Sequence, residues 1–484
     1  MKYATTYNFV NGKFDVSNGK LLNVFSPLNG EVISQVPLSS SAVIDEAVAG
    51  AQQAFPSWSG LPIKERAQIF YRYRNLLEKH FEELACLISE ENGKTLDESR
   101  AEVSVSIEMA EFATSLPQIC LGEIEMVSPG VECRSERYPL GVVAGITPFN
   151  FPNMVPNWKI PNAITLGNTM ILKPSEQVPL SANRIAELLS DAGLPEGVLN
   201  VIHGGRETVE AICEHPGIDS VTFVGSTRVA KIVYRKASGN FKRVLCLGGA
   251  KNHLIVLPDA NEEMTATNVA ASMTGCAGQR CMAAAAMVAV GNTDSIINSL
   301  CKEVKKIVPG ENLGAVISKQ AQERIEGYIT DAESEGAKIL VDGRGVNVKG
   351  KKNGYYVGPT VLDCVTPDMK IAKEEVFGPV LAIMRVDTVD EALKIENKSP
   401  YGNAASVFTQ SGSLANYVTE RASAGMIGVN IGVPVPREPF SFGGWNESKF
   451  GTGDITGKSS IEFWTKLKKT TTKWNPEART NWMS

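Results

Sequence analysis

Short apolar runs separated by helix-like stretches dominate the middle of this chain and restrict what it can fold into. The first series has apolar runs at 142–146, 169–172, 197–202 and 220–224, with helical spacing at about 153–166, 180–192 and 206–214. The runs are nearly continuous in apolar residues, which is typical of strands buried on both faces. Strands that alternate with helices predict a parallel sheet covered by helices, so we expect the α/β class.

A second series of the same kind follows residue 246. Its apolar runs lie near 253–257, 286–290, 379–385 and 404–408. With 484 residues, the chain is long enough for two or three domains, each with its own core. Two doubly wound α/β domains therefore fit the pattern better than one.

The chain before the first series has its own signals. Residues 8–36 indicate short strands, with a turn at Asn11-Gly12. Apolar spacing then predicts helices at 39–54, 62–88 and 96–116.

Two further segments alternate between polar and apolar residues. Residues 123–139 do so around Pro129-Gly130, which indicates a hairpin arm able to cross to another subunit. Residues 461–474 alternate again and predict a late strand at a sheet edge.

Composition and charge limit the partners. Nucleic acid is not expected, because phosphate binding needs a basic surface and the net charge is −5. No apolar run approaches the ~18 residues of a membrane span, and the first residues contain no apolar signal region. Nine cysteines without paired spacing are typical of reduced thiols, and the four histidines form no metal pattern. We therefore expect a cytoplasmic enzyme without a metal.

The strongest candidate for a reactive group lies in Thr274-Gly-Cys-Ala-Gly-Gln-Arg-Cys-Met-Ala283. Cys281 follows Arg280, whose positive charge favours the thiolate, the nucleophilic form of cysteine. Two glycines before it allow the backbone to bend sharply. The alternative is a small buried apolar residue, which is what most unpaired cysteines are. The local sequence favours the nucleophile.

Two strand ends in the first series carry signals for a dinucleotide. Gly225-Ser226 follows the run at 220–224 and opens a helical stretch, so free N–H groups there could hold a phosphate. Lys173 and Glu176 follow the run at 169–172 and could both reach ribose hydroxyls. Glu176 would repel a 2′-phosphate, which favours NAD over NADP. The alternatives are an ordinary strand-to-helix turn and a solvated ion pair.

Asn150 lies between aromatic residues and two prolines in Pro148-Phe-Asn-Phe-Pro152. A rigid loop suits an amide that donates to a developing oxyanion. The alternative is an ordinary turn asparagine.

Six motifs occur in the order and spacing of the aldehyde dehydrogenase superfamily, which this chain resembles over almost its whole length. They are Pro148-Phe-Asn-Phe-Pro152, Lys173-Pro-Ser-Glu176, Phe223-Val-Gly-Ser226, Gly278-Gln-Arg-Cys281, Glu374-Glu-Val-Phe-Gly-Pro379 and Ser441-Phe-Gly-Gly444. Gly249-Ala-Lys-Asn-His253 and Gly278-Gln-Arg-Cys-Met-Ala283 are similar to the methylmalonate-semialdehyde dehydrogenase branch, which is CoA-acylating.

The resemblance implies a fold and roles for residues. A Rossmann-type NAD-binding domain would cover 1–123 and 139–246, and a catalytic domain would cover 247–455. A small β oligomerisation arm and tail would cover 124–138 and 456–484.

The resemblance also implies that Cys281 would be the nucleophile, and that Asn150 with the Cys281 N–H would hold the oxyanion. Lys173 and Glu176 would hold the adenosine ribose and Ser226 the pyrophosphate. The remaining NAD-binding residues would be Phe149, Gly225, Glu375 at the nicotinamide ribose, and Phe377 near it.

The acyl acceptor depends on a residue that this chain lacks. Hydrolytic members of the family carry a general-base glutamate in a Glu-Leu-Gly-Gly-Lys motif before the nucleophile. The corresponding stretch Arg243-Val-Leu-Cys-Leu-Gly-Gly-Ala-Lys251 places Leu247 or Cys246 there, depending on the alignment. General-base assistance is worth roughly 10²–10⁴-fold in rate, so water should be a poor acceptor. The thiol of CoA needs less help, and we expect a thioester product.

The residues expected to bind a substrate carboxylate depart from the branch pattern. The branch usually pairs the equivalent of Arg280 with a second arginine, and an ungapped count from Glu91-Asn-Gly-Lys-Thr95 puts Val105 there. Valine cannot form a charge-assisted pair with a carboxylate. Arg437, shortly before Ser441-Phe-Gly-Gly444, is our candidate for the missing arginine. Its alternative is a pair with Glu438 or with solvent.

The expected reaction is NAD-dependent, CoA-acylating oxidation of methylmalonate or malonate semialdehyde to propionyl-CoA or acetyl-CoA, with loss of carbon dioxide. Valine or thymine breakdown would be its setting, and a homo-oligomer, a dimer or tetramer, is expected. One alternative is oxidation of another short aldehyde to a thioester or an acid. The other is a non-catalytic, thiol-binding protein of the same fold.

Overall fold

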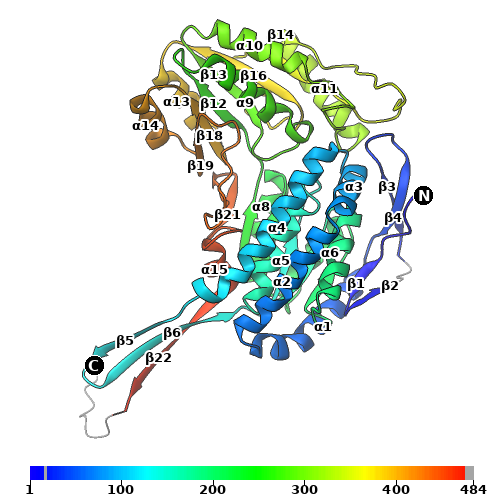
Figure 1. Cartoon of the computed structure of the whole chain (residues 1–484), viewed down its shortest axis with the longest axis vertical. Helices are drawn as coiled ribbons and strands as arrows, with labels where there is room; N and C mark the ends of the chain where they lie inside the picture. Colours follow the sequence, from blue (N-terminus) through cyan, green and yellow to red (C-terminus); the bar gives the residue numbers. More distant parts are fainter. Residues whose placement is uncertain (16–18, 475–484) are drawn as a thin grey trace.

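Two lobes and a thin arm make up the molecule (Figure 1). The structure is a computed structural model that describes residues 1–15 and 19–474. An eight-stranded sheet organises the lower lobe in Figure 1 and a seven-stranded sheet the upper one. Helices flank both sheets, so the predicted α/β class with two sheets is confirmed.

The first sheet has five parallel strands in the order β9-β8-β7-β10-β11. Their bounds are β7 Val142–Ile146, β8 Thr169–Lys173, β9 Leu199–Val201, β10 Ser220–Val224 and β11 Arg243–Leu247. The connecting helices are α5 Met154–Thr165, α6 Pro179–Asp191, α7 Arg206–Glu214 and α8 Thr227–Gly239. The chain runs outward from β7 to β9 and then returns to β10 on the other side of β7. This is the order of a dinucleotide-binding sheet, whose ligands bind outside the carboxyl ends of the strands.

Antiparallel strands close both edges of this sheet. The hairpin of β1 (Asn8–Val10) and β2 (Lys13–Asp15) turns at Asn11-Gly12, where both residues have positive φ, and pairs with β9. The predicted turn is therefore confirmed. At the other edge β21 (Lys449–Gly451) pairs with β11, although it lies beyond the second lobe in the sequence. A separate hairpin consists of β3 (Leu21–Phe25) and β4 (Val32–Pro37).

Four helices precede the first sheet: α1 Ser41–Gly60, α2 Ile63–Lys79, α3 Phe81–Asn92 and α4 Leu96–Ile119. The prediction of one helix at 62–88 was wrong, because the chain breaks at His80, which has φ −102° and ψ 20°. Apolar spacing continues through the break, so periodicity could not reveal it. The change of direction allows α3 to contact both α4 and α6.

The second sheet has the order β14-β15-β16-β13-β12-β18-β19, with only the β14 edge antiparallel within these described strands. The strands are β12 Asn252–Val256, β13 Ala284–Val290, β14 Lys338–Val341, β15 Thr360–Asp363, β16 Val380–Val386, β18 Ala404–Phe408 and β19 Met426–Val429. The helices are α9 Glu262–Thr274, α10 Asp294–Lys305, α11 Lys319–Ser334, α12 Lys370–Lys373, α13 Val389–Lys398 and α14 Gly412–Arg421. The short strands β17 (Tyr401–Gly402) and β20 (Trp445–Asn446) form a separate ladder.

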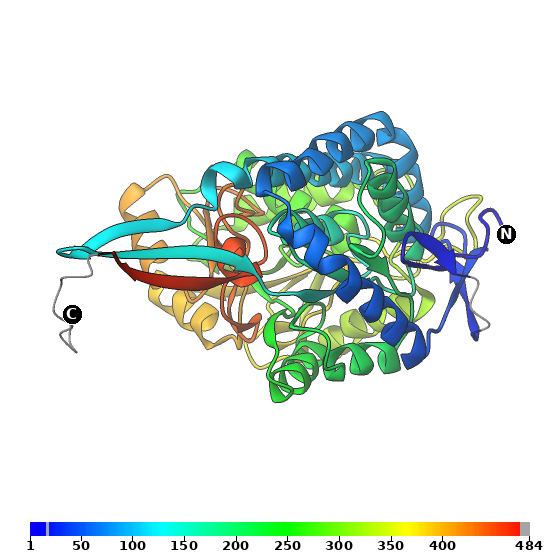
Figure 2. The same ribbon diagram turned by 90° about the horizontal axis from the view of Figure 1, so that it is seen from below.

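The arm is a three-stranded ribbon that projects well beyond the body in two perpendicular views (Figures 1 and 2). It consists of β5 (Glu123–Ser128), β6 (Val131–Pro139) and β22 (Thr465–Lys473), in the order β22-β6-β5. The predicted hairpin and late strand are both present. The strand begins at Thr465 rather than at 461, because the short helix α15 (Ser459–Trp464) buries Ile461, Phe463 and Trp464 against the body. The predicted tail residues 475–484 lie outside the described residues.

The carboxyl ends of the first sheet face the second lobe. In the register, Ile146 lies opposite both Lys173 and Phe223, and Val224 lies opposite Leu247. The segments that follow these strands therefore meet along one edge. Among the described helices, none is both long and apolar enough to cross a membrane.

Candidate active site

Cys281 lies just after a strained turn that joins α9 to β13. The 3-10 helix η1 (Gly275–Gly278) contains Cys276 and Ala277 with φ of 55° and 52°, a conformation that non-glycine residues rarely adopt. A Cβ added to Gly278 would lie 2.1 Å from the backbone of Gly378, so only glycine fits there. Such strain persists only where surrounding contacts enforce it, and it is concentrated at functional sites.

Two asparagines of the second lobe fix the backbone of Cys281. Asn252 Nδ2 donates to the carbonyl oxygens of Cys281 and Ala283, at 2.8 Å each, and Asn403 Nδ2 donates to the Cys281 carbonyl at 2.9 Å. Cys281 lines a narrow pocket, together with Arg280, Glu375, Val376 and Phe377. Asn252 and Asn403 therefore hold the backbone of Cys281 in place, and Cys281 itself lines the pocket.

The surroundings of Cys281 favour the neutral thiol. Burial, with a smaller contribution from the charge of Glu375, raises the pKa of Cys281 to about 12, and the charge of Arg280 opposes the shift. Arg280 therefore lowers the pKa of Cys281, as expected, but by less than burial raises it. The proton of Cys281 must leave as its sulfur attacks.

Asn150 reaches the same turn from the first lobe. Its Nδ2 donates to the carbonyl oxygen of Gln279 at 3.0 Å, two residues before Cys281. Asn150 is buried, and an amide nitrogen carries two N–H groups, so a second one remains for another acceptor. The structure brings the predicted amide and the predicted nucleophile together.

The residues predicted to hold a dinucleotide follow adjacent parallel strands. Lys173 ends β8, is buried, and pairs with Glu176 at 3.1 Å. Burial lowers the pKa of Lys173, and the pair with Glu176 opposes that shift. Gly225 follows β10, and a Cβ added to it would lie 2.5 Å from the ring of Phe223. Ser226 is the N-cap of α8 and has no side-chain cap bond among the described residues, so the first N–H groups of α8 are not capped there.

Glu375 comes from the second lobe and meets the loop after β11. Its Oε1 accepts the N–H of Ala250 at 3.0 Å, and a Cβ added to Gly249 would lie 2.4 Å from its Oε2. Thr227, the first residue of α8, accepts the Gly249 N–H at 2.8 Å through its hydroxyl. Burial raises the pKa of Glu375 to about 7.

Aromatic rings from the two lobes also meet. The rings of Phe149 and Phe377 contact edge to face, with centroids 5.9 Å apart and planes at 89°. Phe377 has a positive φ of 53°. The segments around Asn150 and Glu375 are therefore in direct contact.

The position of the usual general base is apolar and closed. Cys246 and Leu247 lie in β11, are buried, and cannot act as a carboxylate would. Burial raises the pKa of Cys246 well above its usual range. Within the described residues, Glu375 is the acidic side chain that lines the Cys281 pocket.

The two candidate substrate arginines differ in their surroundings. Arg280 Nη2 donates to the carbonyl of Ser272 at 3.2 Å, and in the described part of the chain no carboxylate lies within ion-pair distance of it. Arg437 is exposed and pairs with Glu108 of α4 at 2.6 Å, a partner that the sequence did not indicate. Val105 packs against the apolar cluster that Cys281 also contacts.

Sequence reasoning missed several residues that shape the site. Asn252 lies within the motif Gly249-Ala-Lys-Asn-His253, which marked the branch without indicating a contact. Lys159 is fully buried and donates to the carbonyl of Ile146 at 2.7 Å, and burial lowers its pKa to about 7. Asn403 has no sequence signal that could have indicated its bond to the Cys281 loop.

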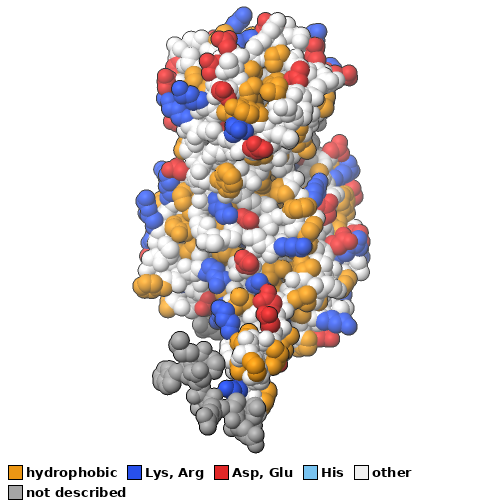
Figure 3. Space-filling view, turned by 90° about the vertical axis from the view of Figure 1, so that its left-hand side faces the viewer, with side chains coloured by type: hydrophobic (Ala, Val, Ile, Leu, Met, Phe, Trp, Pro, Cys, Tyr) orange, Lys and Arg blue, Asp and Glu red, His pale blue; other side chains and the backbone are white. Residues whose placement is uncertain are grey.

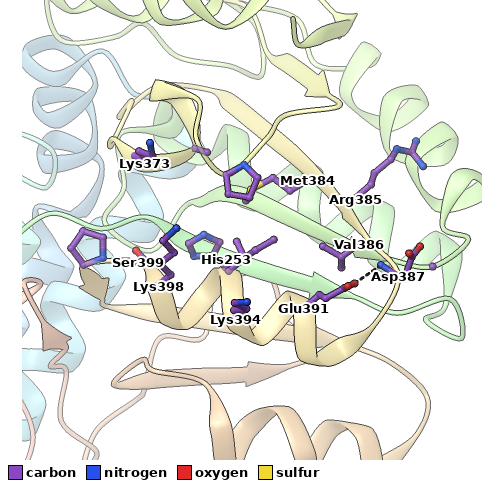
Figure 4. Close-up of a pocket in the computed structure, with 15 residues that line it drawn as sticks. His253, Lys373, Met384, Arg385, Val386, Asp387, Glu391, Lys394, Lys398 and Ser399 are labelled. Carbon is purple, nitrogen blue, oxygen red and sulfur yellow. Dashed lines mark hydrogen bonds between the residues drawn. The ribbon is translucent and has the colours of Figure 1, made fainter. Parts of the chain in front are cut away.

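A larger cavity of about 880 Å³ lies over α13 in the second lobe (Figure 4). His253 lies among the residues drawn, with Lys398 beside it and Lys373 higher in the view. None of the predicted site residues lines it. Burial lowers the pKa of His253 to about 4, and the charge of Lys251 adds to this effect.

The first sheet has the strand order of a dinucleotide-binding fold, and comparison with known proteins gives the family of the chain. Residues 14–470 match the aldehyde dehydrogenase family. The chain belongs to this family, and the expected class, an aldehyde oxidoreductase, is confirmed.

The similar proteins cover nearly the whole chain. Malonate-semialdehyde dehydrogenase 2 of Geobacillus kaustophilus is 44% identical, over 97% of this chain and 99% of the relative. The crystal structure of methylmalonate-semialdehyde dehydrogenase from Oceanimonas doudoroffii has a TM-score of 0.97 and 42% identity, covering 98% of this chain and 99% of that one. A protein from Sinorhizobium meliloti, assigned the same activity and solved with NAD, has a TM-score of 0.96 and 40% identity, over 99% and 100%. The expected branch is confirmed.

Proposed function

We propose that the protein catalyses NAD-dependent, CoA-acylating oxidation of malonate or methylmalonate semialdehyde through a thioester on Cys281. The observation that carries the acylating part is the buried pair Cys246 and Leu247, where hydrolytic members of the family hold a general base. The names of the similar proteins support the substrate class.

The described residues fit a dinucleotide. The first N–H groups of α8 are not capped by the side chain of Ser226, and Gly249 leaves room for the carboxyl of Glu375, where a Cβ would clash. NAD supplies a hydride acceptor when bound. Lys173 and Glu176 would hold the adenosine ribose, and Glu375 would hold the nicotinamide ribose. Gly225 and Ser226 would hold the pyrophosphate. Phe149 and Phe377 would lie beside the nicotinamide end of the cofactor.

The chain's own residues carry the addition step. The Cys281 sulfur bonds to the aldehyde carbon as the C=O π bond breaks, and the thiol proton leaves. Asn150 Nδ2 and the Cys281 N–H would donate to the oxygen, whose charge grows in this step. Removing one such donor costs about 10²–10³-fold in rate in a comparable site. Loss of hydride from the same carbon leaves an acyl group bound to Cys281.

CoA then takes the acyl group. A bond forms between its sulfur and the acyl carbon, the bond to Cys281 breaks, and the Cys281 sulfur takes back from solvent the proton that it lost in the addition step. The substrate carboxylate leaves as carbon dioxide, and the carbon that held it takes the proton of the CoA thiol. Semialdehyde, NAD⁺ and CoA thus give acyl-CoA, carbon dioxide and NADH with atoms and charges balanced.

Binding of the substrate carboxylate is assigned to Arg280, with Arg437 as the second arginine. The guanidinium of Arg280 lies beside Cys281, and its Nε is buried without a hydrogen-bond partner among the described residues. A carboxylate would supply that partner. Arg437 would have to exchange Glu108 for substrate.

A second candidate is hydrolysis of the acyl-enzyme, giving the free acid. Glu375 favours it, because its carboxyl lines the Cys281 pocket and its pKa of about 7 suits a general base. Another short aldehyde could be the substrate of either reaction. Because Glu375 is also assigned to a ribose, the Glu375→Gln variant is compared at saturating NAD, where hydrolysis would lose its base and transfer to CoA would not.

The test is to follow NADH formation with malonate semialdehyde, methylmalonate semialdehyde and propanal, each with and without CoA. We expect a single burst of NADH without CoA and steady turnover with it. Equal steady turnover without CoA would favour hydrolysis. A burst that persists in Cys281→Ala would remove the thioester and the proposed function, and no NADH at all would favour a non-catalytic protein.

We also propose a homo-oligomer, a dimer or tetramer, joined through the arm. Apolar side chains on the arm are exposed, among them Ile124, Met126, Val127 and Leu467, and the arm has hydrophobic atoms on its surface in Figure 3. Exposed apolar ribbons of this kind are typical of subunit interfaces.

The proposed domains are 1–123 with 139–246, then 247–455, and the arm with its tail. One strand of the range 247–455, β21, nevertheless pairs with β11 of the first sheet. The nine cysteines all lie in described segments and none pairs with another there, which supports a cytoplasmic location.

A further inference from the structure

The junction of α3 and α4 lies between the two halves of the proposed site. It contains Glu91-Asn-Gly-Lys-Thr95, a motif to which the proposed chemistry gives no role. Hydrogen bonds run from this junction to the loop of Asn150 in one direction and to the turn before Cys281 in the other.

The first set of contacts brackets Asn150. Asn92 Nδ2 donates to the carbonyl of Phe149 at 2.8 Å. Glu102 Oε1 accepts the N–H groups of Asn153 at 2.8 Å and Met154 at 3.0 Å, at the positive end of α5. The backbone is thus held on both sides of the catalytic amide.

A buried ion pair fixes Glu102 itself. Lys94 Nζ pairs with its second carboxylate oxygen, both side chains are almost fully buried, and the ammonium lies 3.7 Å from the centre of the Phe151 ring. A buried pair of this kind is costly to break, because removing one partner leaves an uncompensated charge. The Asn150 loop therefore rests on a rigid base.

The second set of contacts holds the strained turn. Glu98 Oε1 accepts the N–H of Cys276, whose φ is 55°. The other oxygen of Glu98 accepts the N–H of Thr95 at 3.0 Å and its hydroxyl at 2.9 Å, closing a capping box at the start of α4. A single carboxylate thus ties the start of α4 to the turn that leads to Cys281.

Glu98 and Glu102 are four residues apart, so they lie on one face of α4. We propose that they are positioning residues: Glu102 holds the loop of Asn150, Glu98 holds the turn of Cys281, and α4 thereby sets the separation of amide and sulfur. This inference rests on the proposed function, because it matters only if Asn150 and Cys281 act together. A displacement of about 1 Å in such a pair can reduce the rate roughly 100-fold.

The test compares two capping boxes of the same chain. Thr388 and Glu391 close an equivalent box at the start of α13, which does not contact the Cys281 turn. Glu98→Ala and Glu391→Ala each remove one box and should lower Tm, and Glu98→Ala should lower it further because the Cys276 N–H also loses its acceptor. Only Glu98→Ala should slow the NADH burst, by roughly 10- to 100-fold, with KM for the aldehyde little changed. Glu98→Gln keeps an oxygen for the Cys276 N–H and should recover most of the burst rate.

The outcomes separate this inference from the proposed function. If Glu98→Ala and Glu391→Ala give the same burst rate, Glu98 is only a helix cap and the inference is wrong. If Glu98→Ala does not fold, the burst rate of Glu98→Gln decides. A rate like that of the unaltered protein supports the assignment. A loss as large as that of Asn150→Ala overturns the role given to the Glu98 oxygen that accepts the Cys276 N–H. Turnover that survives in Cys281→Ala would instead contradict the proposed function.

Discussion

The pocket at Cys281 and the cavity over α13 differ in ways that size does not reveal. The cavity measures about 880 Å³ and the pocket about 20 Å³. The cavity is lined by the second lobe alone, with exposed lysines at its rim. The residues that line the pocket also belong to the second lobe, but Asn150 and Phe149 of the first lobe contact the segments beside it.

Several buried groups with shifted pKa lie at the Cys281 pocket, whereas among the described residues His253 is the one such group that lines the larger cavity. Burial raises the pKa of Cys281 and Glu375 and lowers that of Lys251 to about 8, because their charged forms have lost water. Strained backbone is found beside the pocket as well, at Cys276 and Phe377. Perturbed side chains and strain together support the proposal that the Cys281 pocket is the active site.

The largest expected effect on kcat/KM comes from a substitution at the Cys281 pocket, and a substitution at the larger cavity should have none. Cys281→Ser should lower kcat/KM by roughly 10⁴-fold or more, as loss of an activated nucleophile does. Lys398→Ala, at the rim of the larger cavity, should leave kcat/KM unchanged. Steady-state NADH formation measures both, and a large loss in the lysine variant would break the comparison.

Asn150→Ala should have the next largest effect. Loss of an oxyanion donor lowers kcat by about 10²–10³-fold. Affinity for NAD, measured by fluorescence titration, should stay the same. A change confined to KM would mean that the amide binds substrate and does not stabilise the oxyanion.

Glu375→Gln should alter the pH dependence of stability. The pKa of Glu375 rises on folding from about 4.5 to about 7, so its contribution to stability is fully present below pH 4.5 and is lost as pH rises through 7. At pH 8 the glutamine variant should therefore be more stable than the unaltered protein, by up to about 3 kcal/mol, and this advantage should vanish near pH 4.5. Urea unfolding at several pH values measures it, and a pH-independent difference would contradict the shift.

Arg437→Ala should have the smallest effect. The exposed pair with Glu108 is worth roughly 0–1 kcal/mol, so stability should hardly change. If Arg437 binds the substrate carboxylate, kcat/KM should fall by up to about fivefold for malonate semialdehyde and not for propanal. Glu108→Gln, which frees the arginine, is the matched control and should cause no loss. Equal losses on both aldehydes would remove the assignment.

Local patterns in the sequence predicted the two sheets and the strand ends at which several proposed site residues lie. Strand ends are visible as apolar runs that stop at glycine or at charge, which is why Lys173, Glu176 and Gly225 could be assigned to one sheet edge. The two-sheet division follows from the same runs. The break at His80 could not be predicted, because the apolar face of the helix continues across it.

Contacts between distant segments could not be predicted from local patterns. The bonds of Asn403 to Cys281 and of Glu98 to Cys276 join residues 122 and 178 positions apart. The thiol's pKa also depends on burial, which overrides the adjacent arginine. Such effects arise from packing, and they appear only when the chain is folded.

The strand β21 has a consequence for how the chain is made. It pairs with β11, so the first sheet receives its last strand only after the whole second lobe has been synthesised. Until then, a nascent chain carries β11 with a row of unpaired backbone groups, a surface to which other extended chains can add. A ribosome that stalls before residue 449 would therefore release a chain prone to aggregate, even with every catalytic side chain already in place.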